Sequence, residues 1–293
     1  MIPLLQAVVF GVLAGGVYAL VSAGLTLTFG VMRIVNLAHA TFLILSAYLC
    51  YTLWSRFGID PLLVGAIITI PMALLGLVVY RLIIARVQRI DHNLGIIATF
   101  AVAIFLEAFV ELFWGPNQTT ATPSYFNQSL HLGPITIPLA QLYAFLLAAA
   151  VIVAFQLLLR RTALGHAITA SSENPEGARL IGIEPNRIGA AVFALASAST
   201  ALGGAALSFL YQFTPDSQDD WIGLTLCVVI VGGLGNVAAV AASGVFLGLA
   251  ESLTATYVSV RWAAAVPMVL ILLVLLVRPR GLFTRAVRTD VGS

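Results

Sequence analysis

The chain lacks lysine and carries few charged residues of any kind. All 14 of its basic residues are arginine, and charged residues make up 9% of its 293 residues. Without lysine, it can form neither a Schiff base with a carbonyl substrate nor the phosphate-binding lysine of a P-loop. The net charge of +2 and the absence of a basic patch interleaved with aromatic residues predict no nucleic-acid partner.

Cysteine is also scarce, with two residues in the chain. Cys50 and Cys227 both lie in apolar stretches, which is typical of small buried side chains and not of a disulfide. No spacing of His and Cys residues matches a metal-ligand motif, so we expect neither a metal nor a cofactor in this chain. No charged residue precedes Arg33. The first apolar stretch therefore lacks the basic region of a cleaved signal peptide, and we expect it to remain.

Apolar residues, by contrast, make up 60% of the composition. This proportion predicts an all-α, polytopic transmembrane helix bundle, because a single segment spans lipid only if its backbone groups are satisfied within it. With about 20 residues per crossing, we expect about nine spans, within a range of roughly eight to ten because the ends are uncertain. The windows are Leu4–Phe29, Ile34–Trp54, Leu62–Ile84, Leu94–Phe113, Leu139–Leu159, Ile188–Leu210, Trp221–Leu234, Val237–Thr256 and Trp262–Val277.

The arginines predict the orientation of the bundle, because cytoplasmic loops carry an excess of Lys and Arg. With the N-terminus outside and nine crossings, only Arg56 and Arg261 of the 14 arginines face outward. The others face the cytoplasm with the C-terminus: Arg33, Arg81, Arg86, Arg89, Arg160, Arg161, Arg179, Arg187, Arg278, Arg280, Arg285 and Arg288. The seventh window is short, but a crossing there keeps the C-terminal arginines inside. We interpret it as a span that is tilted or broken near its glycines.

Ionisable residues inside apolar windows are costly in lipid and indicate functional positions. Glu107 and Glu111 lie four residues apart on one helix face toward the outer end of the fourth window, and Glu251 lies in the eighth. Three carboxylates toward one side do not form the chain of groups that a proton relay requires. We favour carboxylates at an outer mouth, hydrogen-bonded to neighbouring helices or water. The adjacent outer loop, residues 115–138, fits either a lid or partner contact, or an extended connector.

The second window begins with three polar residues at one-turn spacing, Arg33, Asn36 and His39. A polar stripe at the inner end of a span either gates a translocation path or satisfies backbone groups at a helix start. Both interpretations remain open. Two glycine pairs, Gly11 with Gly15 and Gly244 with Gly248, each place small residues on one helix face and indicate close helix contacts.

Residues 160–188 interrupt the apolar chain and hold seven of its 26 charged residues. Within them, Ser172 or Asn174 can cap a short helix that has Pro175 at its first position. Acidic residues, Glu173 and Glu176 among them, cluster at its start, and Gly182 would end it.

This short helix is expected to expose Glu176 and Arg179 and to keep Ala178, Leu180 and Ile181 for packing. An amphipathic helix on the cytoplasmic side fits insertion into a groove of another protein. The alternative is a helix lying on lipid, which its few basic residues disfavour.

Three stretches resemble the permease subunits of branched-chain amino acid ABC importers. Residues 24–40 (GLTLTFGVMRIVNLAHA), 232–251 (GGLGNVAAVAASGVFLGLAE) and 278–282 (RPRGL) are similar to segments of that family, and residues 160–188 resemble its ATPase-coupling loop. The order of these stretches is also that of the family. The sequence departs from the family at Ala40, where Gly is usual, and at Ala238 and Ala239, where Pro-Gly is common. These departures bear on the identity of the substrate more than on the fold.

The resemblance implies one transmembrane permease domain, residues 1–293, in a bacterial inner membrane. It implies a second permease, identical or paralogous, two separate ATPase subunits that use the ATP, and a periplasmic binding protein that delivers the substrate. The implied ATPase-coupling residues are Glu173, Asn174, Pro175, Glu176, Arg179 and Gly182, and those of a translocation path or gate are Arg33, Asn36, His39, Gly232, Gly233 and Gly235.

Two other classes of protein remain alternatives. A secondary transporter or channel that works without an ATPase would need an ion or proton site near the midplane of the membrane. A membrane enzyme would need a nucleophile, a base and an orienting group at suitable spacing, which the sequence lacks. The sequence does not identify the solute, and relatives of the same architecture carry urea, amides or aromatic acids.

Overall fold

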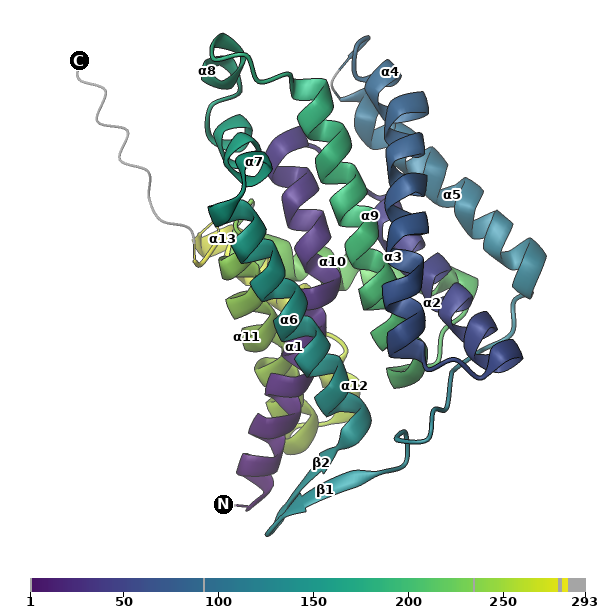
Figure 1. Ribbon diagram of the computed structural model, residues 1–293. Coiled ribbons are helices and arrows are strands. Elements are labelled where there is room, and N and C mark those ends of the chain that lie inside the picture. Colours follow the sequence, from purple (N-terminus) through teal and green to yellow (C-terminus); the bar gives the residue numbers. More distant parts are fainter. Residues whose placement is uncertain (1, 92, 234, 279–280, 284–293) are drawn as a thin grey trace.

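The computed structural model describes residues 2–91, 93–233, 235–278 and 281–283, which form a helix bundle (Figure 1). All nine apolar windows contain helix, as predicted. The helices are α1 (Ile2–Met32), α2 (Ala38–Phe57), α3 (Pro61–Val79) continued by the π-helical η1 (Tyr80–Ile84) and by α4 (Ala85–Val87), α5 (Leu94–Trp114), α6 (Leu139–Arg161), α7 (Ala163–Glu173), α8 (Pro175–Leu180), α9 (Pro185–Leu210), the 3-10 turn η2 (Pro215–Ser217), α10 (Gln218–Gly232), α11 (Val237–Tyr257), α12 (Val260–Ala263) and α13 (Val266–Val277).

In the described part of the chain, six helical segments are long and apolar enough to cross a membrane: Ile2–Met32, Pro61–Val87, Leu94–Trp114, Leu139–Arg161, Pro185–Leu210 and Val237–Tyr257. The other three windows correspond to α2, α10 and the pair α12–α13. With about 1.5 Å of rise per residue, the 12 residues of α13 extend only about 18 Å. Nine crossings and the orientation of the termini therefore stay predictions. Leu234, Arg280, Arg285 and Arg288 lie outside the described residues.

The glycine pairs bring α1 and α11 into backbone contact, as predicted. A Cβ atom added to Gly15 would lie 2.5 Å from the Cα atom of Val245 and 2.6 Å from the carbonyl oxygen of Gly244. One added to Gly11 would lie 2.9 Å from the carbonyl oxygen of Gly248. Only hydrogen fits at these positions, so the two helices pack more closely here than side chains would permit.

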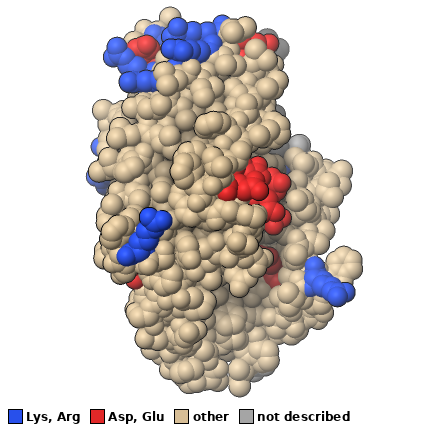
Figure 2. Space-filling view, turned by 90° about the vertical axis from the view of Figure 1, so that its right-hand side faces the viewer, with Lys and Arg blue, Asp and Glu red and all other residues tan. Residues whose placement is uncertain are grey.

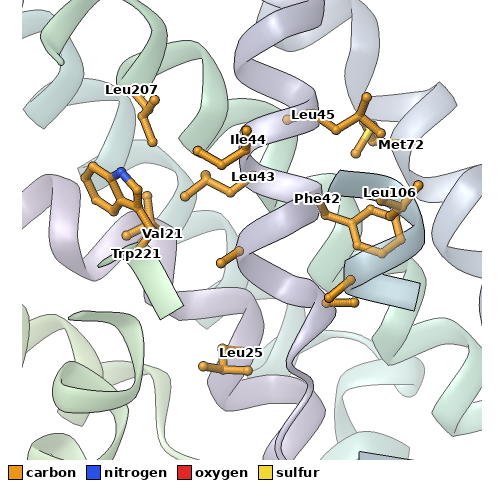
Figure 3. Close-up of a cluster of buried hydrophobic side chains, with 14 of the residues drawn as sticks. Val21, Leu25, Phe42, Leu43, Ile44, Leu45, Met72, Leu106, Leu207 and Trp221 are labelled. Carbon is orange, nitrogen blue, oxygen red and sulfur yellow. The ribbon is translucent and has the colours of Figure 1, made fainter. Parts of the chain in front are cut away.

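α2 lies at the centre of the largest hydrophobic cluster (Figure 3). Its residues Phe42, Leu43, Ile44 and Leu45 are buried against side chains of other helices, Met72 of α3 among them. Phe42 packs edge-on against Phe193 of α9, with ring centroids 6.1 Å apart. α2 is thus surrounded by protein, whereas α3, α5, α6 and α13 keep many large apolar side chains exposed, as lipid-facing helices do.

The predicted outer loop contains a small antiparallel hairpin, β1 (Ser129–Leu132) and β2 (Ile135–Pro138), which the all-α prediction omitted. Gln6 of α1 holds β2 through two hydrogen bonds with the backbone of Thr136, at 2.7 and 3.0 Å. Tyr125 donates a 3.3 Å hydrogen bond to Asp60, the residue that caps α3. Burial first, and then the Asp60 carboxylate, raise the pKa of the Tyr125 hydroxyl. The loop is therefore fastened to two helices.

Arginines gather at the opposite end of the bundle from this hairpin. Figure 1 shows α4 and α8 at one end of the molecule and the N-terminus with the hairpin at the other. Figure 2 shows most of the visible basic side chains in a group at the end that carries α4, and an acidic patch part-way along the same face. The charge asymmetry expected from the sequence is therefore present in the folded chain.

Candidate functional site

The polar segment 160–188 folds into two short helices, α7 and α8, where one was predicted. Asn174 caps α8, since its Oδ1 atom accepts a 2.9 Å hydrogen bond from the backbone N–H of Gly177. This resolves the choice between Ser172 and Asn174 in favour of Asn174. Pro175 is the first residue of α8, and Gly182 follows its end with a φ of 86°. The predicted helix and its ends are confirmed.

The prediction that Leu180 and Ile181 pack inward is wrong. Leu180 is 88% exposed and Ile181 is 75% exposed, while Ala178 alone of the three is buried. The reason is the length of α8, which ends after six residues, so its last apolar residues extend beyond the bundle instead of turning back onto it. Glu176 and Arg179 are also exposed, as expected. The tip of α8 thus presents two apolar side chains between charged ones.

α7 connects this tip to the interior of the bundle. Ser172 and Glu173, at its C-terminal end, line a cavity of about 310 Å³ together with Gly30 of α1 and Gly235 between α10 and α11. The Ser172 carbonyl accepts a long, 3.4 Å hydrogen bond from Arg33. The C-terminal end of α7, the end of α1 and the α10–α11 turn therefore meet around this cavity.

Arg33, Asn36 and His39 do not form the predicted helical stripe. Arg33 has a φ of 51°, a left-handed conformation that ends α1, and the next helical residue is Ala38. The backbone between them is not helical, so the three side chains diverge. Arg33 is exposed. Asn36 is buried, and its Oδ1 atom has no hydrogen-bond partner within the described ranges. His39 donates from Nε2 to the Val21 carbonyl at 2.8 Å. Non-helical backbone at membrane depth is tolerated where protein surrounds it.

The glycines after α10 allow three backbones to meet at this end. A Cβ atom on Gly30 would lie 3.0 Å from the Cα atom of Gly235, whose N–H donates to Thr26 at 3.1 Å. A Cβ atom on Gly281 would lie 2.6 Å from the Cα atom of Gly233. A Cβ atom on Gly232 would lie 2.8 Å from the hydroxyl of Ser243 in α11. The three stretches that carry the family resemblance therefore come together here.

The predicted outer carboxylates separate into two sites. Gln218, at the start of α10, donates to Glu107 and accepts from Thr41 of α2. Glu251 instead accepts a 2.6 Å hydrogen bond from the hydroxyl of Tyr18 in α1. The interpretation of carboxylates hydrogen-bonded to neighbouring helices is confirmed for these two.

No sequence signal identified Gln218, Tyr18 or Thr26 as partners of the predicted residues, because each contact joins segments far apart in the chain. α7 could have been found, since Thr162 precedes it and caps it through Gly165 at 3.0 Å. Within the described ranges, no three His, Cys, Asp or Glu side chains lie close enough to hold a metal ion.

The model of one protein family, described as the permease component of branched-chain amino acid transport systems, matches residues 7–275. The chain belongs to this family. The permease is accordingly a transport subunit and a multi-pass protein of the inner (plasma) membrane. The match covers Gly30, Gly235 and the helices α7 and α8, whereas Gly281 lies beyond its end.

Curated relatives match along nearly the whole permease. It is 28% identical to the high-affinity branched-chain amino acid transport permease LivH of Escherichia coli K12, over 96% of each chain. It is 26% identical to the corresponding permease BraD of Pseudomonas aeruginosa, again over 96% of each chain, and 26% identical to a probable LivH of Methanocaldococcus jannaschii, over 90% of this chain and 87% of the relative. No solved structure matches the permease significantly.

Proposed function

We propose that this permease forms the translocation path of an ABC importer for branched-chain amino acids or a related small polar solute, and that separate ATPase subunits drive it. The proposed substrate rests on the relatives, which are named as branched-chain amino acid permeases. The comparisons give no support to a secondary transporter or channel that works without an ATPase.

The tip of α8 carries the proposed ATPase contact. Leu180 and Ile181 are exposed beside Glu176 and Arg179, at the end of the molecule where arginines gather. A short capped helix with an apolar tip and charged flanks suits insertion into a groove of another protein. Glu173, Asn174, Pro175 and Gly182 would shape this helix rather than contact the partner through their side chains.

The position of α7 suggests how the ATPase would reach the path. Closure of an ATPase dimer would pull α8, and α7 would transmit the movement to the end of α1 and the α10–α11 turn. α7 is hydrogen-bonded to Arg33 through Ser172 and shares a cavity with Gly30 and Gly235. Arg33, Asn36, His39 and the glycines Gly232, Gly233 and Gly235 would then form or move a gate. Glycine-supported close contacts suit this role, because a small shift of one backbone there must displace the other.

The proposed topology has nine crossings, an outside N-terminus and a cytoplasmic C-terminus, with residues 1–293 as one permease domain. The α8 end would be cytoplasmic and the hairpin end, in loop 115–138, outside. In its support, α10 begins at Gln218, which binds Glu107 of α5. It ends at Gly232, three residues before Gly235, which lies against Gly30 of α1 and near Ser172 of α7. The backbone of Leu282, after α13, also reaches the end of α10, donating to Val231 at 2.8 Å.

The remaining partners follow from the family. A second permease, identical or paralogous, would complete the path, and a periplasmic binding protein would deliver the substrate to the outer face. Uptake of labelled leucine that unlabelled isoleucine and valine suppress, and urea does not, would support the proposed substrate class. Suppression by urea alone would contradict it.

The ATPase contact is tested with the double variant Leu180→Gln/Ile181→Gln in the assembled transporter. Burial of each side chain is worth about 1.5–3 kcal/mol, so we expect at least about a tenfold loss of co-purified ATPase and of substrate uptake, with permease abundance unchanged. The matched control is Ile90→Gln, which alters an equally exposed apolar residue at the same end, outside α8. Normal ATPase recovery and uptake in the double variant, or an equal loss in the control, would refute the contact.

A further inference from the structure

A cavity of about 390 Å³ lies at the arginine-rich end, on the bundle side of α8. It is bounded by the end of α1, the η1–α4 segment, the α7–α8 pair and the start of α9. Its polar lining includes Arg33, Gln88, Arg89, Arg179 and Asn186. Its volume is within the range of about 300–1,000 Å³ that is usual for small-ligand sites.

The charge of this cavity is one-sided. Three of its lining residues are arginines from three different segments, and none of the described lining residues is Asp or Glu. Among the described residues, the one ion pair joins Arg187 to Glu184 at 2.5 Å, and these two residues flank the lining residues Pro185 and Asn186 without lining the cavity themselves. Three arginines line one cavity and no carboxylate is among its described lining residues, so its walls carry net positive charge, which an anion would offset.

Two further features favour an acceptor in the cavity. Gln88 lines it, and its Nε2 atom, which lies beside Gly95 of α5, is buried without a hydrogen-bond partner among the described residues. An unsatisfied buried donor costs about 1–3 kcal/mol. Asn186 and Pro185 belong to the first turn of α9, a 26-residue helix whose N-cap, Glu184, makes no side-chain hydrogen bond to the helix and pairs with Arg187 instead. The backbone N–H groups and the positive end of the helix dipole there favour an anion.

We propose that this cavity binds a phosphate group. Planar guanidinium groups match phosphate oxygens in pairs, and an amide N–H and a helix N-terminus add donors of the same kind. The phosphate can come from the headgroup of an anionic membrane lipid or from a soluble phosphate compound of the cytoplasm, since both present the same oxygens. The site goes beyond the proposed transport function and does not depend on it.

A bound phosphate would join elements that are otherwise in limited contact. Arg179 lies on α8, Arg33 in the break after α1, and Arg89 after α4. Bridging these three would fix α8 against the bundle, so the ligand would set how far α8 can move when a partner pulls on it.

The test uses the full-length permease in neutral detergent and variants outside the proposed coupling and gating residues, Arg89→Gln and Gln88→Leu. The probes are dihexanoyl phosphatidylglycerol, inorganic phosphate and, as the neutral lipid, dihexanoyl phosphatidylcholine, measured by isothermal titration calorimetry. The matched control is Arg187→Gln, a nearby exposed arginine outside the cavity. The melting temperature of each variant reports whether it is folded.

We expect Arg89→Gln to weaken binding of the phosphate probe about tenfold or more, as befits loss of a charged hydrogen bond, and Gln88→Leu to weaken it less. The control should bind the phosphate probe as the wild type does. Added salt should weaken the binding of the phosphate probe by every variant. Binding of phosphatidylglycerol alone identifies a lipid headgroup as the source, and binding of inorganic phosphate as well identifies a soluble one. No binding of either, equal binding of phosphatidylcholine, or unchanged binding by a folded Arg89→Gln variant would overturn the proposal.

Discussion

At the scale of single residues, the fold depends on positions that have no room for a side chain. Gly11 and Gly15 of α1 face Gly244 and Gly248 of α11 across backbone contacts. In lipid there is little hydrophobic force between helices, so close packing of this kind is a main source of their association. The sequence identified these glycines by their spacing, although the pairing of one helix with the other came from the fold.

Gly15→Ala should destabilise the permease by about 1–3 kcal/mol, because the new methyl group would overlap the backbone of α11. The matched control is Gly223→Ala in α10, where a Cβ atom would meet only the flexible end of Met268 at 3.3 Å. Thermal unfolding in detergent, followed by tryptophan fluorescence, measures both. A control that loses as much stability as Gly15→Ala would mean that the loss does not arise from the α1–α11 contact.

The contact between Tyr18 and Glu251 provides a second prediction at this scale. Tyr18→Phe and Glu251→Gln should each destabilise the permease by about 1–3 kcal/mol, because each leaves a buried polar group with a weaker partner or none. The double variant should lose about 1 kcal/mol less stability than the sum of the two single losses, because changes to residues in contact are not additive. Tyr257→Phe, in the same helix as Glu251 but exposed, should be neutral. Strict additivity of the two changes would argue against the 2.6 Å hydrogen bond.

At the scale of elements, local sequence signals located α8 well and the start of α2 poorly. The cap at Asn174 and the proline after it act within one turn, so their effect is readable from neighbouring residues. The break at Arg33 has no such signal. A continuous helix would satisfy the local pattern equally well. The left-handed conformation of Arg33 costs free energy, and contacts of residues 33–37 with other helices offset that cost. One of these contacts is the hydrogen bond from the backbone N–H of Leu37 to the Thr99 hydroxyl at 3.2 Å.

Asn174→Ala should weaken α8 by about 1 kcal/mol, the usual cost of losing an N-cap. Asn174→Asp keeps an acceptor for the Gly177 N–H and should retain the helix. If α8 binds an ATPase, ATPase recovery and uptake should fall in the alanine variant and stay near normal in the aspartate variant. Equal loss in both variants would mean that the side chain acts through something other than the cap.

At the scale of the whole molecule, the fold separates the two ends that the proposed orientation assigns to opposite sides of the membrane. α4 and α8, with their arginines, lie at one end, and the hairpin lies at the other (Figure 1). The predicted sidedness follows from charge alone. The fold adds that the ends of α1 and α10 and the segment after α13 meet near one another, as the proposed topology expects.

Accessibility labelling tests this orientation. Cys50 and Cys227 are buried, so their replacement by alanine gives a background for the single changes His131→Cys, Glu176→Cys and Ser293→Cys. In intact cells, a membrane-impermeant maleimide should label the first and reach the other two only after the membrane is opened. Labelling of Ser293→Cys from outside would contradict the nine crossings.

The sequence by itself determined the membrane class, the helical windows, the charge asymmetry, the short capped helix and, through its motifs, the family. These properties depend on composition or on residues a few positions apart. Only the tertiary structure decided that Leu180 and Ile181 are exposed, that Arg33 ends a helix, that Glu251 pairs with Tyr18, and that three arginines surround one cavity. Each of these depends on packing between segments distant in the chain, where the free energy of one contact is set by neighbours that local pattern does not encode.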